Sequence, residues 1–199
     1  MTEERGSNAT PNDAPPEEDP RPDGLRSAKS LLLVNTGDGK GKSSSAFGIV
    51  MRSIAQDLKV AVVQFVKSGK WNTGEERICR EQLGVDWWAM GEGFTWDSSD
   101  LTEDQAAAQT AWRHAQGCIS SGAYGLVVLD ELTYPVNWGW LSAEEVATAV
   151  LGRPEATSIV MTGRDAPPEL IEVAHTVTEM RNIKHAYEQG IVAKKGIDQ

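Results

Sequence analysis

The stretch LLLVNTGDGKGKS at residues 31–43 decides the fold of this chain. Its apolar half, residues 31–34, is typical of a buried strand, and residues 44–54 are typical of a helix. Between them, three glycines let successive backbone N–H groups point toward one anion, and the helix start adds partial positive charge. A strand, a glycine-rich turn and a helix in this order predict a phosphate-binding loop.

The side chains of the loop match nucleotide binding. Lys42 can reach phosphate oxygens, and Ser43 can place its hydroxyl on Mg²⁺. The stretch departs from G-x-x-x-x-G-K-[ST] at its first position, where Thr36 replaces glycine. A glycine-rich turn that merely contains lysine is the alternative, but the flanking strand and helix favour phosphate binding. We therefore expect ATP to contact Thr36, Gly37, Asp38, Gly39, Lys40, Gly41, Lys42, Ser43 and Ser44.

Two carboxylates, Asp130 and Glu131, follow the apolar run LVVL at residues 126–129. This pattern places both at the carboxyl end of a central strand, the edge at which the phosphate loop also lies. One of them can bind Mg²⁺ directly or through water, opposite Ser43. Two solvated acids at a strand end are the alternative. The phosphate loop makes a metal role the stronger prediction.

Apolar strand-like runs alternate with helical patterns along the chain. Continuous apolar runs indicate strands covered on both faces, as in a parallel sheet. Capping boxes at Thr102-x-x-Gln105 and Ser142-x-x-Glu145 predict two helix starts. We expect a single α/β P-loop (RecA-like) domain with a mostly parallel, doubly wound sheet flanked by helices. The predicted strands are residues 31–34, 59–66, 85–89, 126–129, 158–162 and 176–179, and the predicted helices are residues 44–54, 75–83, 103–120, 143–151 and 168–174.

Length and composition limit the number of domains and the class of protein. The 199 residues suit one domain with a full α/β core. Residues 1–26 hold seven acidic residues and five of the nine prolines, which predicts a disordered acidic tail ahead of a domain at 27–199. The net charge of −10 argues against a nucleic-acid surface. Without a long apolar run or signal segment, and with Cys79 and Cys118 as isolated thiols, we expect a cytoplasmic protein without membrane contact.

Two further signals leave alternatives open. Phe94 and Trp96 lie in the glycine-rich segment GEGFTW at 91–96, after Met90. Such aromatics either plug the core or line an apolar pocket for a flat ligand. Arg164, in TGR at 162–164, follows a strand on the edge of the phosphate loop. It either reaches a terminal phosphate or belongs to an ordinary surface turn.

Taken together, six stretches resemble the P-loop type of ATP:corrinoid adenosyltransferases, in that family's order. The resemblance covers about residues 30–199 and includes the unusual G-E-G-F-T-W loop. Two serines stand at 43–44 where the family commonly has two threonines, so the hydroxyls are kept. The stretches are NTGDGKGKSSSAFG at 35–48, VVQFVKSGKWNTGEE at 62–76, MGEGFTW at 90–96, VVLDELTY at 127–134, TGR at 162–164 and IKHAYEQGIVAKKGID at 183–198.

The resemblance implies a reaction. Such enzymes transfer the 5′-deoxyadenosyl group of ATP to the Co(I) of a reduced corrinoid and release tripolyphosphate, in adenosylcobalamin biosynthesis or salvage. It implies that Lys42 and Mg²⁺ neutralise charge on the leaving group. Ser43 and Glu131 are then the metal partners, with Asp130 as a support.

The resemblance also implies roles for residues outside the phosphate loop. Arg164 resembles the family's phosphate-contacting arginine, and Arg52 its residue near the nucleoside. Phe94 and Trp96 match the apolar side chains that displace the lower axial ligand of the corrinoid, and Met90 belongs to the same corrinoid-binding segment. A homodimer and a flavoprotein reductant are expected at the level of the family.

Two other functions use the same loop. A P-loop ATPase or kinase would cleave the γ-phosphate, with Glu131 activating water or an acceptor hydroxyl, and would release phosphate or ADP. A RecA-like nucleic-acid module would use ATP to regulate binding, but the net acidity and the lack of a basic stripe argue against it. The sequence does not indicate whether a complete corrinoid or a biosynthetic intermediate is preferred.

Overall fold

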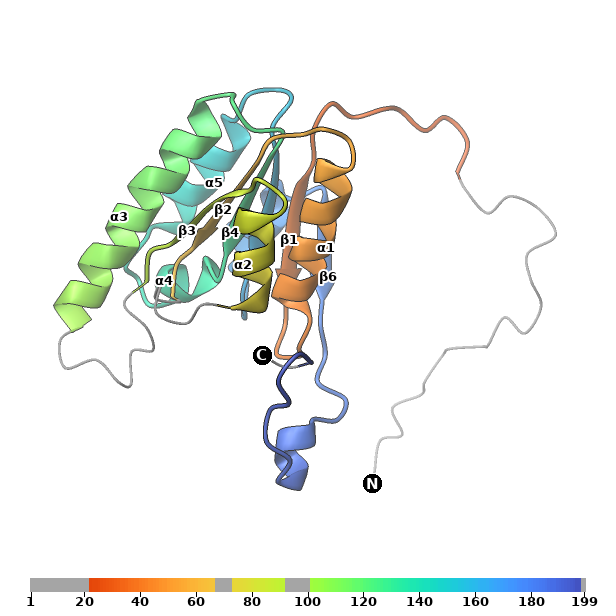
Figure 1. Cartoon of the computed structure of the whole chain (residues 1–199). Coiled ribbons are helices and arrows are strands. Elements are labelled where there is room, and N and C mark those ends of the chain that lie inside the picture. The colour runs from red at the N-terminus through yellow and green to blue at the C-terminus, as the bar shows by residue number, and fades with distance from the viewer. Residues whose placement is uncertain (1–21, 67–72, 92–100, 198–199) are drawn as a thin grey trace, which may run out of the picture.

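The computed structural model of the chain describes residues 22–66, 73–91 and 101–197. Its six strands form one sheet in the order β3-β2-β4-β5-β1-β6, and every neighbouring pair is parallel (Figure 1). The carboxyl ends of β1, β4 and β5 therefore meet at one edge of the sheet. The strands are β1 (Leu32–Thr36), β2 (Val60–Gln64), β3 (Asp86–Ala89), β4 (Leu126–Asp130), β5 (Ser158–Thr162) and β6 (Thr176–Glu179).

Helices cover both faces of this sheet. Buried side chains of α1 and α2 pack against one face, and those of α3, α5 and α6 pack against the other. The doubly wound α/β fold is thereby confirmed. The helices are α1 (Lys42–Ile54), α2 (Gly74–Glu81), α3 (Leu101–Ser120), α4 (Thr133–Asn137), α5 (Ala143–Leu151), α6 (Pro168–Val173) and a 3-10 helix, η2 (Ala186–Gln189).

Some element ends differ from the sequence predictions. Helix α1 begins at Lys42, two residues early, because Gly41 at φ 108° turns the chain directly into the helix. Helix α3 begins at Leu101, so Thr102 lies inside it and the predicted cap there is wrong. The other cap is confirmed, since the Ser142 hydroxyl accepts the Glu145 N–H at 3.3 Å. The short helices α4 and η2 were not predicted.

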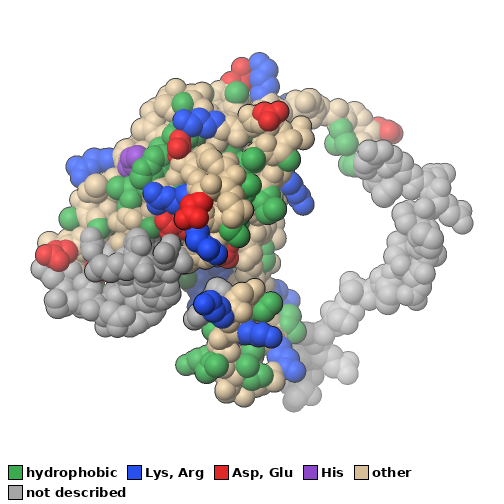
Figure 2. Space-filling view, viewed as in Figure 1, with side chains coloured by type: hydrophobic (Ala, Val, Ile, Leu, Met, Phe, Trp, Pro, Cys, Tyr) green, Lys and Arg blue, Asp and Glu red, His purple; other side chains and the backbone are tan. Residues whose placement is uncertain are grey.

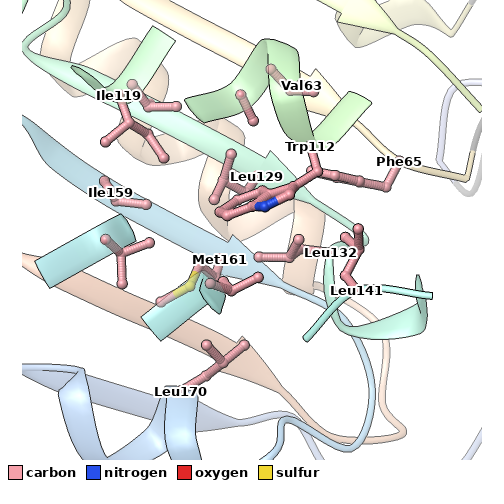
Figure 3. Close-up of a cluster of buried hydrophobic side chains, with 14 of the residues drawn as sticks. Val63, Phe65, Trp112, Ile119, Leu129, Leu132, Leu141, Ile159, Met161 and Leu170 are labelled. Atoms are coloured by element: carbon pink, nitrogen blue, oxygen red, sulfur yellow. The ribbon is translucent and has the colours of Figure 1, made fainter. Parts of the chain in front are cut away.

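The larger of two core clusters lies between the sheet and α3, α5 and α6. Figure 3 shows Trp112 of α3 beside Leu129 of β4, with Met161 of β5 below them. All five residues of β4 are buried, as expected for a strand covered on both faces. That prediction is wrong for β6, whose four residues are exposed because it is the last strand of the sheet and, among the described residues, has β1 as its one neighbour.

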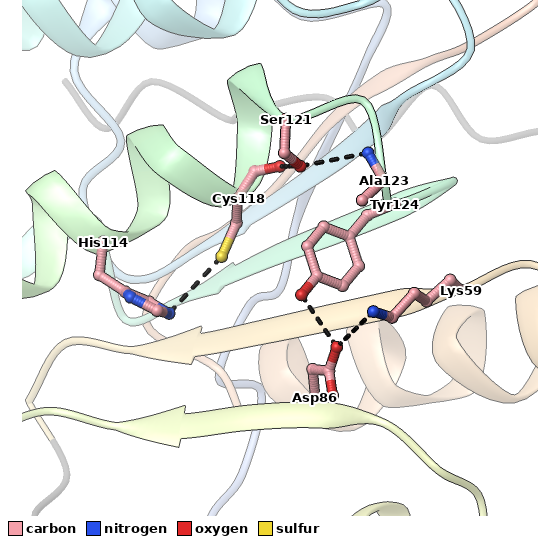
Figure 4. A network of polar contacts seen from close by, with 7 residues as sticks. All are labelled: Lys59, Asp86, His114, Cys118, Ser121, Ala123 and Tyr124. Atoms are coloured by element: carbon pink, nitrogen blue, oxygen red, sulfur yellow. Dashed lines mark hydrogen bonds and ion pairs between the residues drawn. The ribbon is translucent and has the colours of Figure 1, made fainter.

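A polar cluster joins the amino ends of β2, β3 and β4, opposite to the carboxyl ends of the strands (Figure 4). Asp86 Oδ2 lies 3.0 Å from Lys59 Nζ and accepts the Tyr124 hydroxyl at 2.9 Å. The hydrogen bond from Lys59 lowers the pKa of Asp86. Burial and the bond to Asp86 raise the pKa of Tyr124 to about 12. We infer a stabilising role for this cluster.

Both cysteines, Cys79 and Cys118, are buried and form no disulfide, as the sequence predicts. Burial raises the pKa of each thiol, Cys79 and Cys118, so neither favours the reactive thiolate. Within the described ranges, no helix is both long enough and apolar enough to cross a membrane.

Candidate active site

The phosphate loop connects β1 to α1 at the carboxyl edge of the sheet. Gly37 and Gly41 have φ of 96° and 108°, which only glycine adopts without strain. A Cβ on Gly37 or Gly39 would also collide with backbone atoms of Met180 and Arg181, which follow β6. The Gly39 N–H donates to Met180 O at 2.7 Å. The glycines are therefore required by the close approach of the segment after β6 as well as by the loop's own turn.

Lys42 lies half-buried at the start of α1, with its ammonium folded over the loop. Nζ donates to Gly37 O at 2.8 Å and to Gly39 O at 2.6 Å. Partial burial lowers the pKa of Lys42, and the positive charge of Arg164 lowers it further. The carboxylates of Asp38, Glu131 and Asp165 act in the opposite direction. Lys42 and Arg164, from distant parts of the chain, thus lie close enough to interact, with three carboxylates near them.

The first turn of α1 carries the remaining loop residues. Ser43 is half-buried and Ser44 is exposed, while Asp38 and Lys40 are exposed on the loop itself. Behind them, the buried Asn35 side chain donates to Lys42 O at 3.2 Å and so ties the strand end to the helix start.

Asp130 ends β4 and is fully buried. Its Oδ2 accepts the Gln64 amide at 2.8 Å, and its Oδ1 accepts the Thr162 hydroxyl at 2.7 Å. Gln64 in turn accepts the indole N–H of Trp87 at 3.1 Å. Since protein donors occupy both of its oxygens, Asp130 is suited to support the strand ends rather than to bind a metal ion directly.

Glu131, the next residue, turns the chain out of the strand. Its φ of 63° lies in the left-handed region, which costs a non-glycine residue about 1–2 kcal/mol. The Glu131 N–H donates to Thr162 Oγ1 at 2.9 Å. The hydrogen bonds that join Gln64, Asp130 and Thr162 therefore fix the backbone of Glu131. Strain held at a strand end beside a phosphate loop is typical of a functional position.

A Mg²⁺ ion fits the chemistry of this edge. The Ser43 hydroxyl and the half-buried Glu131 carboxylate are hard oxygen donors, the class that Mg²⁺ prefers. Across the described ranges, no three His, Cys, Asp or Glu side chains gather into a metal-binding group. An ion here would therefore take its other ligands from phosphate oxygens and water, as is usual for Mg²⁺.

The turn between β5 and α6 carries Arg164, whose side chain is exposed. The Gly163 N–H donates to Asn35 O at 3.2 Å, and the Ala166 N–H donates to Thr36 Oγ1 at 3.0 Å. Thr36, which replaces the first glycine of the loop signature, thus binds this neighbouring turn through its hydroxyl. The turn and the phosphate loop are directly joined.

Most of the sequence agrees with one group of enzymes. Residues 28–199 match the family model described as ATP:corrinoid adenosyltransferase BtuR/CobO/CobP. The chain belongs to the ATP:corrinoid adenosyltransferase family. The match includes every residue assigned above to the candidate site, and the family resemblance expected from the motifs is confirmed.

Relatives named corrinoid adenosyltransferases match this chain over most of their length. The chain is 46% identical over 174 residues to a corrinoid adenosyltransferase of Pseudomonas aeruginosa, covering 87% of this chain and 85% of that protein. It is 41% identical over 170 residues to one of Escherichia coli K12, covering 85% and 86%. A Salmonella typhimurium relative is 39% identical over 170 residues, with the same coverage.

The structure does not bring every residue that the adenosyltransferase resemblance singled out to the phosphate loop. Arg52 is exposed in the last turn of α1, ten residues beyond Lys42 and so about 15 Å along the helix axis. Met90 is half-buried and directly follows β3, where its N–H donates to Gln64 O at 3.0 Å. Phe94 and Trp96 lie outside the described residues. Their roles stay predictions.

Several residues that build the candidate site were not predicted from the sequence. Asn35, Gln64 and Thr162 are buried polar residues at the carboxyl ends of otherwise apolar strands, and that position was the signal that could have found them. The contact between the loop and Met180 had no such signal, because it joins segments about 140 residues apart in the chain.

Proposed function

We propose that this protein transfers the 5′-deoxyadenosyl group of ATP to the cobalt(I) of a reduced corrinoid and releases tripolyphosphate. The observation that carries the proposal is the Lys42 ammonium held over the phosphate loop by Gly37 O and Gly39 O, in a chain whose family adenosylates corrinoids. Cobalt(I) supplies the electron pair for the new cobalt–carbon bond. The C5′–oxygen bond breaks, and its electron pair leaves with tripolyphosphate.

The protein's part in this reaction is to hold the leaving group. The Lys42 ammonium can exchange its contacts with Gly37 O and Gly39 O for phosphate oxygens. A hydrogen bond to a charged group contributes about 1.5–3 kcal/mol, and it strengthens as negative charge collects on the leaving oxygen. The Arg164 guanidinium offers a planar fork of donors to the same anion. No proton is abstracted, so no general base is needed.

Ser43 and Glu131 would hold Mg²⁺ beside the triphosphate, and Asp130 would fix the strand ends that carry the site. When bound, the ion neutralises part of the triphosphate charge. Arg52 is assigned to the nucleoside on the strength of the family resemblance.

The segment that contains Phe94 and Trp96 is proposed to bind the corrinoid and to displace its lower axial ligand. Its first residue, Gly91, follows β3 at the carboxyl edge of the sheet and packs so closely on the Val66 backbone that a Cβ has no room. This packing supports a start of the segment on the edge that carries the phosphate loop. Aromatic side chains there would exclude water and the axial ligand from the cobalt.

A homodimer is supported by the C-terminal arm, defined as residues 180–197. Figure 1 shows this segment projecting from the body of the domain, and Figure 2 shows hydrophobic and basic side chains on it. Ile183, Tyr187, Val192 and Ile197 are 76–81% exposed. Grouped apolar side chains of this size mark a contact surface, and a second copy of the chain would cover them. The electron donor is proposed to be a flavoprotein, from the resemblance alone.

The phosphate assignment is tested with Lys42→Met, which keeps most of the side-chain length and removes the charge. The initial rate of adenosyl transfer from ATP to chemically reduced cobalt(I) should fall by about 10- to 100-fold, the equivalent of about 1.5–3 kcal/mol. Lys29→Met is the matched control, since Lys29 is exposed and pairs with Glu155 away from the loop. Equal rates for the two variants would reject the assignment.

The corrinoid assignment is tested with Phe94→Ala and Trp96→Ala in two assays. The loss should be large when cobalt(II) is reduced on the enzyme by a weak donor, because the lower ligand returns. It should be smaller when cobalt(I) is supplied ready-made, and ATP affinity should barely change. Equal losses in both assays would contradict the axial-ligand role.

A further inference from the structure

Helix α4 binds the turn that carries Arg164. The Thr133 hydroxyl donates to Arg164 O at 2.6 Å. The Asn137 side-chain amide donates to the same carbonyl at 3.2 Å and to Asp165 O at 3.0 Å. Thr133 and Asn137 are four residues apart, so they lie on one face of the helix. That face holds two consecutive carbonyl groups of the turn.

The turn has an unusual backbone on both sides of Arg164. Asp165 has φ 49°, in the left-handed region, and Gly163 has φ 144°. A Cβ on Gly163 would collide with the Thr133 side chain. Such conformations cost about 1–3 kcal/mol for a non-glycine residue and persist only when surrounding contacts impose them. Arg164 lies between these two positions, so the contacts that impose the turn also decide where its side chain starts.

Those contacts come from two sides. On one side, Asn35 O accepts the Gly163 N–H and Thr36 Oγ1 accepts the Ala166 N–H, both at the end of β1. On the other side lies α4. Without either side, the turn could leave its strained conformation and move the guanidinium away from the loop.

We propose that Thr133 and Asn137 are positioning residues for adenosyl transfer, which fix the Arg164 backbone so that its guanidinium reaches the triphosphate. The inference rests on the proposed role of Arg164. Its consequence is specific: removing either side chain weakens the binding of triphosphate, and it does so only through Arg164. Adenosine, which has no phosphate, binds as before.

The test measures the affinity of inorganic tripolyphosphate by calorimetry, with adenosine as the phosphate-free control. Thr133→Val keeps the side-chain shape without the hydroxyl, and Thr133→Ser keeps the hydroxyl. Asn137 is exposed, so Asn137→Ala tests the proposal even if substitution of the buried Thr133 by valine lowers stability. We expect Thr133→Val and Asn137→Ala to weaken tripolyphosphate about 3- to 10-fold, the scale of one neutral hydrogen bond, and Thr133→Ser to restore the affinity.

The same substitutions are then made in an Arg164→Ala background. Arg164→Ala alone should weaken tripolyphosphate by about 10- to 100-fold. In that background, Asn137→Ala should cause no further loss, because the group that it positions is gone. An equal loss in both backgrounds would overturn the inference, as would wild-type affinity for Asn137→Ala alone. Wild-type affinity for Arg164→Ala would instead overturn the proposed role of Arg164, and the inference with it.

Discussion

The hydroxyl of Thr162 links the two acidic residues at the end of β4. It donates to the buried Asp130 Oδ1 at 2.7 Å and accepts the Glu131 N–H at 2.9 Å. Thr162→Val removes both hydrogen bonds and keeps the shape of the side chain. The substitution therefore tests whether this hydroxyl holds the strained Glu131 in place.

The expected cost follows from the two contacts. The bond to the Asp130 carboxylate is fully buried, and a hydrogen bond to a charged group contributes about 1.5–3 kcal/mol. The bond from the partly buried Glu131 N–H adds about 0.5–1.5 kcal/mol. The free energy of unfolding should fall by about 2–4.5 kcal/mol. At about 3 kcal/mol, a domain of this size loses roughly 6–12 °C in melting temperature.

Urea denaturation of wild type, Thr162→Val and Thr162→Ser measures the effect. The serine variant keeps the hydroxyl and should lose only about 1 kcal/mol for one buried methyl group. Adenosyl transfer should fall in Thr162→Val, since Glu131 is no longer held, and should be largely kept in Thr162→Ser. If the two variants unfold at the same urea concentration, the hydroxyl does not link the strands as argued.

Three further predictions concern strain, pH and the N-terminal segment. Glu131→Gly should raise the free energy of unfolding by about 1 kcal/mol, because glycine relieves the strain of φ 63°. It should also abolish adenosyl transfer. If Glu131→Gly and Glu131→Gln are equally stable in urea, Glu131 is not strained. The raised pKa of Tyr124 stabilises the fold below its ordinary value of 10, and that gain is lost as the pH rises to about 12. The difference in urea stability between wild type and Tyr124→Phe should therefore shrink from pH 10 to 12, and a constant difference would refute the bond to Asp86. Deleting residues 1–26 should leave the melting temperature nearly unchanged, and a large fall would show that they belong to the core.

The strands and the phosphate loop were predictable because their signals are local. Apolar runs such as LVVL at 126–129 report burial on both faces, and alternating glycines report a turn that other residues cannot make. Helix α4 carried no such signal. It has only five residues, Thr133–Asn137, with a proline in its first turn, too few for a helical period to show.

The contacts that build the site were not predictable, because they depend on which strands become neighbours. Asp130 meets Thr162 only because β4 pairs with β5, and it meets Gln64 only because β4 pairs with β2. For Arg52, too, the sequence did not predict the position that the fold gives it. The family resemblance placed Arg52 near the nucleoside, but the length of α1 places it far along the helix from Lys42.

The most direct test of the central claim identifies the products of one anaerobic reaction. The protein is mixed with ATP, Mg²⁺ and a chemically reduced cobalt(I) corrinoid, and both the corrinoid spectrum and the phosphate products are followed. The account predicts a light-sensitive alkylcobalt spectrum and one tripolyphosphate for each corrinoid adenosylated. Formation of phosphate or ADP without an alkylcobalt product would contradict it.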